Sequence, residues 1–386
     1  MNLDLKHFNS FTNDIIVVDG FWGGGKSVAT SLIGSMTGVE KKKVEHVYEY
    51  VCIAHSAGKM NGDAAKAFLK IYADLSQYNN LIGREVNLRW SDDSGFRNNP
   101  GSLTYLRRLF HPGGDNVAEK ISKENLALLI ASHELIAVSD LLYESFGSRL
   151  KLIEVVRHPV HLFNNVRDYT ATFERSREFT LSFEVNGVKV PWFAAKWADE
   201  FVASSVTDRA LLSIARMQGA MINAIDSINS AQKPLLVLSF ESTVLQPQDS
   251  INRLEKFLGR QSTRRTNRVL KQQNLPRQQI SAGSSWIHQC GICSSGCGSC
   301  WLYICRRAVL GLHELCDSSD RCESRCQFLL PNIQQGVHGV PEGYCFARRT
   351  NRKRGIRPLS FTRQKCTSCD GGTHALKRRQ VNQRRW

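Results

Sequence analysis

Short apolar runs alternate with stretches of helical periodicity between residues 14 and 259. Five regions are typical of buried strands: Ile15–Val18, Val44–Ile53, Leu126–Ala131, Leu150–Val156 and Pro234–Phe240. Apolar spacings of three and four predict helices at residues 63–78, 102–110, 115–121, 134–146, 160–175, 192–202, 208–228 and 248–258. Asn186-Gly187 predicts the turn of a small hairpin within Phe179–Val188. Strands that alternate with helices predict a mostly parallel sheet with helices on both faces, a three-layer α/β/α fold.

The periodic pattern ends near residue 283, where the composition of the chain changes. Beyond that point Cys, Ser, Gly and Arg dominate, and eleven of the 12 cysteines lie between Cys290 and Cys369. Residues 284–386 hold 17 Lys+Arg against 6 Asp+Glu, so +11 of the net charge of +16 belongs to them. We therefore expect one domain over residues 1–283 and an irregular Cys- and Arg-rich tail over residues 284–386.

Three interpretations of this tail are open. CxxC pairs at residues 290–293, 297–300 and 366–369 are potential thiolate ligands, although their spacing differs from that of a zinc site. The basic runs at 348–357 and 377–385 would bind nucleic acid non-specifically, as a disordered arm with too little apolar pattern to fold. An abrupt change of composition is also what translation of a shifted reading frame produces.

The composition of the whole chain, with 42% hydrophobic and 22% charged residues, is that of a soluble globular protein. Residues 1–283 contain one cysteine, Cys52, which argues against a disulfide framework and favours a reducing compartment. The first residues lack the apolar core of a signal peptide. No apolar stretch reaches the roughly eighteen residues that a membrane span needs. We expect a cytoplasmic protein without a membrane span.

The strongest motif lies between the first apolar run and a helical pattern that begins at Val28. Gly20 to Ser27, written GFWGGGKS, has the phosphate-loop spacing of two glycines followed by Lys and Ser. Glycines let backbone N–H groups turn inward around an anion, and the helix N-terminus and Lys26 add positive charge. The sequence therefore predicts a phosphate site here.

A magnesium-binding carboxylate, which phosphate-loop kinases and hydrolases place at the end of another strand, is not evident. The runs at 126–131, 151–156 and 235–240 are followed by Ser132, Arg157 and Glu241. Because ligands bind at the carboxyl ends of parallel strands, Arg157 is placed to hold a second anionic group. A phosphate loop with an arginine beside it fits a nucleotide phosphorylated at two positions.

Three segments together resemble bacterial or phage sulfotransferases that use 3′-phosphoadenosine 5′-phosphosulfate (PAPS). They are IIVVDGFWGGGKS at 15–27, FGSRLKLIEVVRHP at 146–159, and LSFE at 238–241 with INRLEKFLG at 251–259. The resemblance covers residues 14–283 and implies a P-loop NTPase-like fold. It implies that the 5′-phosphosulfate is held by Gly23, Gly24, Gly25, Lys26 and Ser27.

The resemblance also implies that Arg157 holds the 3′-phosphate and that no metal is required. Asn165 stands where the family commonly has a serine, and an amide still donates a hydrogen bond to phosphate. Arg277, in RQQISAG at 277–283, would belong to a loop that closes over the 3′-phosphate. Lys26 would stabilise the charge that develops on the leaving phosphate.

A general base must take the proton of the acceptor, a small-molecule or carbohydrate hydroxyl or amine. The candidates are His46, Glu49, His55, His133 and Glu134, of which Glu49 and His133 are preferred. An aromatic stripe, Phe193, Trp197 and Phe201, would pack in the core or line an acceptor pocket. Oligomeric state does not follow from the sequence.

Two other functions fit parts of the same sequence. The loop matches the nucleotide-hydrolase pattern in full, so a kinase or NTPase that uses Mg-ATP or GTP is one alternative. A nucleic-acid-binding protein that acts through its basic tail is the other.

Overall fold

The computed structural model describes residues 3–8, 11–84, 86–89, 95, 101–111, 113–173 and 179–280. All of them belong to one unit of the chain, Met1–Asp317. The expectations for the tail at 284–386, including its CxxC pairs and its nucleic-acid-binding runs, lie outside the described residues.

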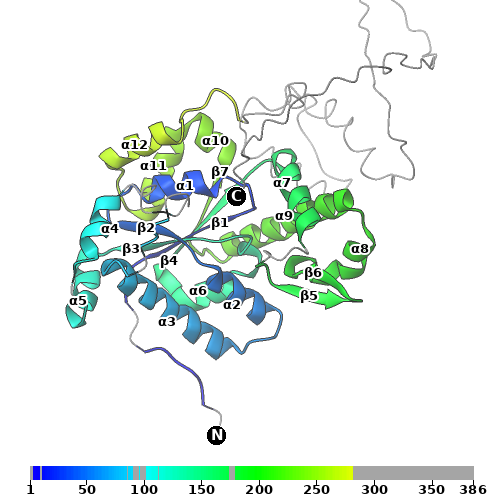
Figure 1. Ribbon diagram of the computed structural model, residues 1–386, viewed down its shortest axis with the longest axis horizontal. Helices are drawn as coiled ribbons and strands as arrows, with labels where there is room; N and C mark the ends of the chain where they lie inside the picture. The colour runs from blue at the N-terminus through cyan, green and yellow to red at the C-terminus, as the bar shows by residue number, and fades with distance from the viewer. Residues whose placement is uncertain are drawn as a thin grey trace, which may run out of the picture. The chain divides into compact units, whose positions relative to one another are not determined.

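A five-stranded sheet forms the centre of the described region (Figure 1). Its order is β2-β3-β1-β4-β7, and every neighbouring pair is parallel. The strands are β1 (Ile15–Gly20), β2 (Val39–Val44), β3 (Ala127–Ala131), β4 (Leu150–Val156) and β7 (Leu235–Ser239). A separate antiparallel hairpin pairs β5 (Ser182–Val185) with β6 (Val188–Pro191).

Helices cover both faces of this sheet (Figure 1). Short 3₁₀ segments lie between some of these helices and their neighbouring strands. The helices are α1 (Lys26–Ile33), α2 (His46–Ser56), α3 (Gly62–Leu81), α4 (Ser102–Arg108), α5 (Asp115–Glu124), α6 (Asp140–Phe146), α7 (Pro159–Thr172), α8 (Ala198–Ala203), α9 (Val206–Ser230), α10 (Phe240–Leu245), α11 (Pro247–Leu258) and α12 (Arg264–Gln272).

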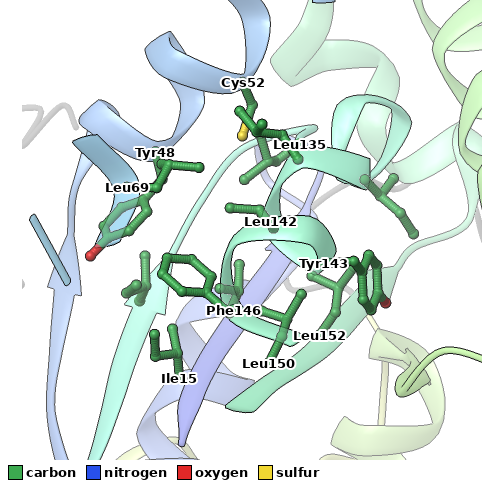
Figure 2. Packing of buried hydrophobic residues seen from close by; sticks show 14 of the residues in the cluster. Ile15, Tyr48, Cys52, Leu69, Leu135, Leu142, Tyr143, Phe146, Leu150 and Leu152 are labelled. Atoms are coloured by element: carbon green, nitrogen blue, oxygen red, sulfur yellow. The ribbon is translucent and has the colours of Figure 1, made fainter. Parts of the chain in front are cut away.

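Alternation along the strands creates two cores, because successive side chains point to opposite faces. Ile15 and Val17 of β1 pack with residues of α2, α3, α6 and α9. Figure 2 shows part of this core, with Cys52 of α2 above Leu142 of α6 and Leu152 of β4. Ile16 and Val18 pack on the other face, with residues of α1, α10, α11 and α12. The expected three-layer α/β/α fold with a parallel sheet is confirmed.

The expected second strand within Val44–Ile53 is wrong. The strand runs over Val39–Val44, and the helix α2 occupies residues 46–56. The strand was missed because its sequence, VEKKKV, is charged; Lys41 and Lys43 are nevertheless buried, and lysine can bury its aliphatic stem. Residues 44–53 resemble a strand because they are rich in β-branched and aromatic side chains.

Two expected helices are shorter than their apolar spacing indicates. Residues 134–146 contain a 3₁₀ segment, Ile136–Val138, before α6 begins at Asp140. Residues 192–202 divide into a 3₁₀ segment, Trp192–Trp197, and α8. The other expected strands and the hairpin are confirmed within a few residues. No helix in the described part of the chain is long and apolar enough to cross a membrane.

A first prediction concerns the core on the α6 side of the sheet. Leu152 is 0% exposed on β4, so Leu152→Ala should lower the free energy of unfolding by about 2–5 kcal/mol. The matched control is Leu75→Ala on α3, where the side chain is 45% exposed and a change within about 0.5 kcal/mol is expected. Urea unfolding measures both, and equal losses would contradict this placement of the core.

Candidate functional site

The predicted phosphate loop connects β1 to α1 at the carboxyl edge of the sheet. Gly23 and Gly25 have φ of 72° and 93°, in the left-handed region that favours glycine. A side chain on Gly23 would overlap the amide of Asn165, and one on Gly25 would overlap the ring of Phe240. The glycines therefore let the backbone pass close to α7 and α10, and the first-turn N–H groups of α1 lie beside them.

Lys26 turns back into the loop and is buried. Its Nζ donates hydrogen bonds to the carbonyl oxygens of Gly20 and of Phe21, the latter at 2.7 Å. Ser27, which follows it, is exposed. Main-chain oxygens of the loop thus hold the lysine. An anion bound in the loop would compete with these oxygens for the Lys26 ammonium.

Three buried carboxyls, Asp19, Glu134 and Glu154, surround Lys26 closely enough to affect its pKa. Asp19 accepts hydrogen bonds from Ser132 Oγ at 2.9 Å and Ile136 N at 2.7 Å. Burial raises the pKa of all three carboxyls, although the charge of Lys26 opposes the rise. Burial lowers the pKa of Lys26, and the carboxylates oppose that change. We call these four residues the lysine–carboxyl cluster.

Arg157 lies beside the loop, at the end of β4. Its Nη1 donates to the carbonyl oxygen of Gly23, and its guanidinium stacks over the Phe240 ring, 4.6 Å from the centroid. Its Nε is buried without a hydrogen-bond partner among the described residues. An arginine that is held by one Nη1 hydrogen bond and by a ring, with its Nε–H unused, is suited to an anion.

Asn165 and Arg277 lie next to the same groups. The Asn165 amide is close enough to Gly23 to exclude a side chain there. The Arg277 guanidinium also lies over the Phe240 ring, 5.8 Å from its centroid, and burial and the Arg277 charge both lower the pKa of Arg157. The structure therefore brings the predicted loop, Arg157, Asn165 and Arg277 together.

The two preferred base candidates are also in contact with each other. Glu49 Oε1 accepts from the His133 backbone N at 2.9 Å and lies 3.0 Å from His133 Nδ1. Glu49 Oε2 lies 3.0 Å from Nδ1 of His46, one turn earlier on α2. The two imidazoles are stacked, with centroids 5.8 Å apart and planes 18° from parallel.

The charges in this group influence one another. Burial works to raise the pKa of Glu49, but hydrogen bonds from His133 and His46 lower it to about 2. Burial and the charge of Lys26 lower the pKa of His133. His133 is therefore a neutral imidazole near neutral pH, held by an ionised carboxylate and close to the lysine of the loop.

The other base candidates lie elsewhere. His55 is at the last turn of α2, with Nδ1 3.0 Å from the Met60 carbonyl oxygen. Glu134 is buried below the loop and accepts from Trp22 N at 3.3 Å. These contacts give both residues a local structural role.

The aromatic stripe is divided between two environments. Trp197 and Phe201 are 8% and 1% exposed in the core beside the hairpin. Phe193 contacts Trp22 of the loop at a centroid distance of 5.6 Å, and Trp22 stacks on Tyr169 of α7 at 4.2 Å. Only the first residue of the stripe reaches the loop.

Sequence reasoning missed Asp19, Glu154 and Phe240 as parts of the site. Asp19 and Glu154 are charged residues within apolar runs, which is the signal that could have revealed them. The sheet places them opposite each other on β1 and β4. Phe240 has no such signal, because its contact with Gly25 depends on the packing of α10 against the loop.

No family model matches the sequence, and no curated protein matches it. Among solved structures, it is similar to the sulfotransferase domain from the curacin biosynthetic pathway, at 12% identity and a TM-score of 0.37, over 72% of this chain and 82% of that one. Sulfotransferase STF1 from Mycobacterium tuberculosis H37Rv is 12% identical, with a TM-score of 0.33, over 78% and 77%. The sulfotransferase domain of the Synechococcus PCC 7002 olefin synthase is 11% identical, with a TM-score of 0.35, over 69% and 80%. Scores this low establish neither a family nor an activity.

The lysine–carboxyl cluster predicts a pH-dependent effect of Glu154→Gln. Well below the ordinary pKa of 4.5 the carboxyl is protonated in folded and unfolded chains alike. Above pH 4.5 the Glu154 carboxyl loses its proton in the unfolded chain first, because its pKa is raised in the folded chain. The free energy of unfolding of the wild type therefore falls as the pH rises. Glutamine carries no proton to lose. Relative to the wild type, the variant should therefore gain about 1 kcal/mol or more between pH 5 and pH 8, since a tenfold change in proton affinity corresponds to about 1.4 kcal/mol.

Urea unfolding at the two pH values measures this difference. The control is Glu119→Gln, an exposed carboxylate on α5, for which no such difference is expected. A Glu154→Gln variant whose stability relative to the wild type is the same at both pH values would contradict the account of the cluster.

Proposed function

We propose that the chain is a sulfotransferase, which moves a sulfuryl group from PAPS to a hydroxyl or amine of a small-molecule or carbohydrate acceptor. The observation that carries the proposal is the pairing of a phosphate loop with Arg157, whose Nε is buried without a partner in the described part of the chain. Residues 1–283 would form the catalytic domain. The sequence resemblance at 15–27 and 146–159 agrees with this function.

The residues present fit a donor with two phosphate groups. The loop, from Gly23 to Ser27, would hold the 5′-phosphosulfate through backbone N–H groups and Lys26. Arg157 and the Asn165 amide would hold the 3′-phosphate, with Arg277 adding positive charge. Bound PAPS supplies an activated sulfuryl group. The new bond joins the acceptor atom to sulfur as the bond from sulfur to the 5′-phosphate oxygen breaks.

Lys26 serves the leaving group in this proposal. Its ammonium is already fixed below the loop by two carbonyl oxygens, with which the leaving phosphate would compete for its positive charge. Preorganised charge of this kind stabilises a transition state more than mobile solvent does. The carboxyls around Lys26 keep the lysine in place below the loop.

His133 accepts the proton of the acceptor in this proposal. An ionised Glu49 can only accept hydrogen bonds, so the Nδ1 that faces it carries the proton. The Nε2 lone pair is then free to take a proton from a hydroxyl or an ammonium group. Glu49 orients the ring and stabilises the imidazolium that forms, as a positioning residue.

A kinase or NTPase is the second candidate, since the loop has the complete nucleotide-hydrolase pattern. In a kinase or NTPase, Asp19 and Glu134 below the loop would be the candidate magnesium ligands. Asp19 already accepts two hydrogen bonds from protein groups, which makes it a poorer magnesium ligand than a carboxylate facing an open site.

Arg157→Gln tests the assignment of the second phosphate. The wild type should bind adenosine 3′,5′-bisphosphate at least about tenfold more tightly than AMP. AMP has no 3′-phosphate, so it cannot make the charge-assisted contact with Arg157. The variant should bind the two nucleotides with similar affinity. Isothermal titration in EDTA measures both, with Arg268→Gln, an exposed arginine on α12, as the control. A variant that keeps the preference would rule out this role for Arg157.

His133→Gln tests the base. The rate of sulfuryl transfer should fall by about 100-fold or more, while the affinity for adenosine 3′,5′-bisphosphate stays within about twofold, because His133 does not touch the phosphate groups. Transfer of radioactive sulfate from PAPS to a panel of hydroxyl and amine acceptors measures the rate. His55→Gln is the matched control on α2 and should keep the wild-type rate. Wild-type transfer by His133→Gln would show that another group is the base.

A further inference from the structure

His46, Glu49 and His133 form a compact group of donor atoms that the transfer reaction does not fully use. His46 and Glu49 lie three residues apart in the first turn of α2, and His133 follows β3. The carboxylate lies between the two imidazoles, with each of its oxygens 3.0 Å from one Nδ1. Proton uptake by His133 requires Glu49, but it gives no role to His46.

The three donor atoms are close enough to share one cation. One atom from each residue can be chosen so that all lie within 4.8 Å of one another. Around a cation bonded at about 2.0–2.2 Å, neighbouring ligand atoms lie roughly 3–3.5 Å apart. Side-chain rotations would be needed to bring the three atoms to coordination distance, and the His46 side chain is 43% exposed.

The kinds of donor atom select the cation. Two imidazole nitrogens and one carboxylate oxygen suit Zn²⁺ and its transition-metal neighbours. Magnesium and calcium prefer all-oxygen sites, so this group does not suit them. Because His46 is the exposed member and Glu49 the buried one, the solvent side would supply a water as the fourth ligand.

We propose that His46, Glu49 and His133 bind a Zn²⁺ ion or a similar divalent transition metal. The site is separate from the phosphate loop and needs no nucleotide. Its link to activity rests on the proposed function. A metal on Nδ1 of His133 leaves the ring proton on Nε2, which then has no lone pair for the acceptor. Zinc binding and proton uptake by His133 therefore exclude each other.

Titration of the full chain with ZnCl₂, without nucleotide, tests the site. The cysteines between 290 and 369 would compete for zinc, so the thiols are alkylated first. Cys52 is 0% exposed, and burial raises the pKa of its thiol to about 12, which protects it from alkylation. The alkylated wild type should bind one zinc ion. His46→Gln, Glu49→Gln and His133→Gln should each weaken that binding by about tenfold or more.

His55→Gln, on the same helix, is the matched control and should bind zinc as the wild type does. His46→Gln alters the most exposed of the three ligands, so its loss of affinity is the result least affected by misfolding. Absence of zinc binding in the alkylated wild type would overturn the proposal, as would equal zinc affinity in the wild type and His46→Gln. Zinc binding by a chain that fails to bind adenosine 3′,5′-bisphosphate would support the metal site and refute the proposed donor.

Discussion

A buried ammonium group below the phosphate loop is the constraint on which the rest of the site depends. Lys26 lies among Asp19, Glu134 and Glu154, in an interior where an unpaired charge would cost several kcal/mol. The carboxyls and two main-chain oxygens offset that cost, and in return the lysine fixes the path of the loop. The first turn of α1 therefore begins beside the loop, at the carboxyl edge of the sheet.

The parallel sheet brings the remaining groups to that edge. Arg157 follows β4 and Phe240 follows β7, and these strands are neighbours in the order β1-β4-β7. A hydrogen bond from the His158 backbone N to Glu241 Oε1, at 2.9 Å, joins the ends of the two strands. Arg157 is thereby held between the loop carbonyl of Gly23 and the Phe240 ring. On the other side of β1, the end of β3 positions His133 against α2.

The sequence allowed the fold class and the location of the loop to be predicted, because both depend on local patterns. Apolar runs identify the strands of a covered sheet, and glycines followed by Lys26 identify an anion site. The second strand was placed wrongly because it contains Lys41 and Lys43. Lysine is usually an exposed residue, but both of these lysines are buried. A hydrophobic pattern counts lysine as a charged residue and does not show that its aliphatic chain can be buried.

Pairings between distant residues could not be predicted in the same way. The sequence indicates Glu49 and His133 as separate candidates for the general base. Their contact could not be predicted, because it depends on α2 packing beside the end of β3. The position of Asp19 opposite Glu154 depends on strand register, and that of Phe240 against Gly25 on helix packing. These are tertiary constraints, and no spacing along the chain encodes them.

The central claim is that this loop and Arg157 hold a nucleotide phosphorylated at two positions, without magnesium. Isothermal titration of the full chain with adenosine 3′,5′-bisphosphate in EDTA, and with ATP in the presence of magnesium, tests that claim most directly. The account predicts saturable binding of the bisphosphate in EDTA, with an affinity that magnesium does not improve. Magnesium-dependent binding of ATP together with no binding of the bisphosphate would contradict it.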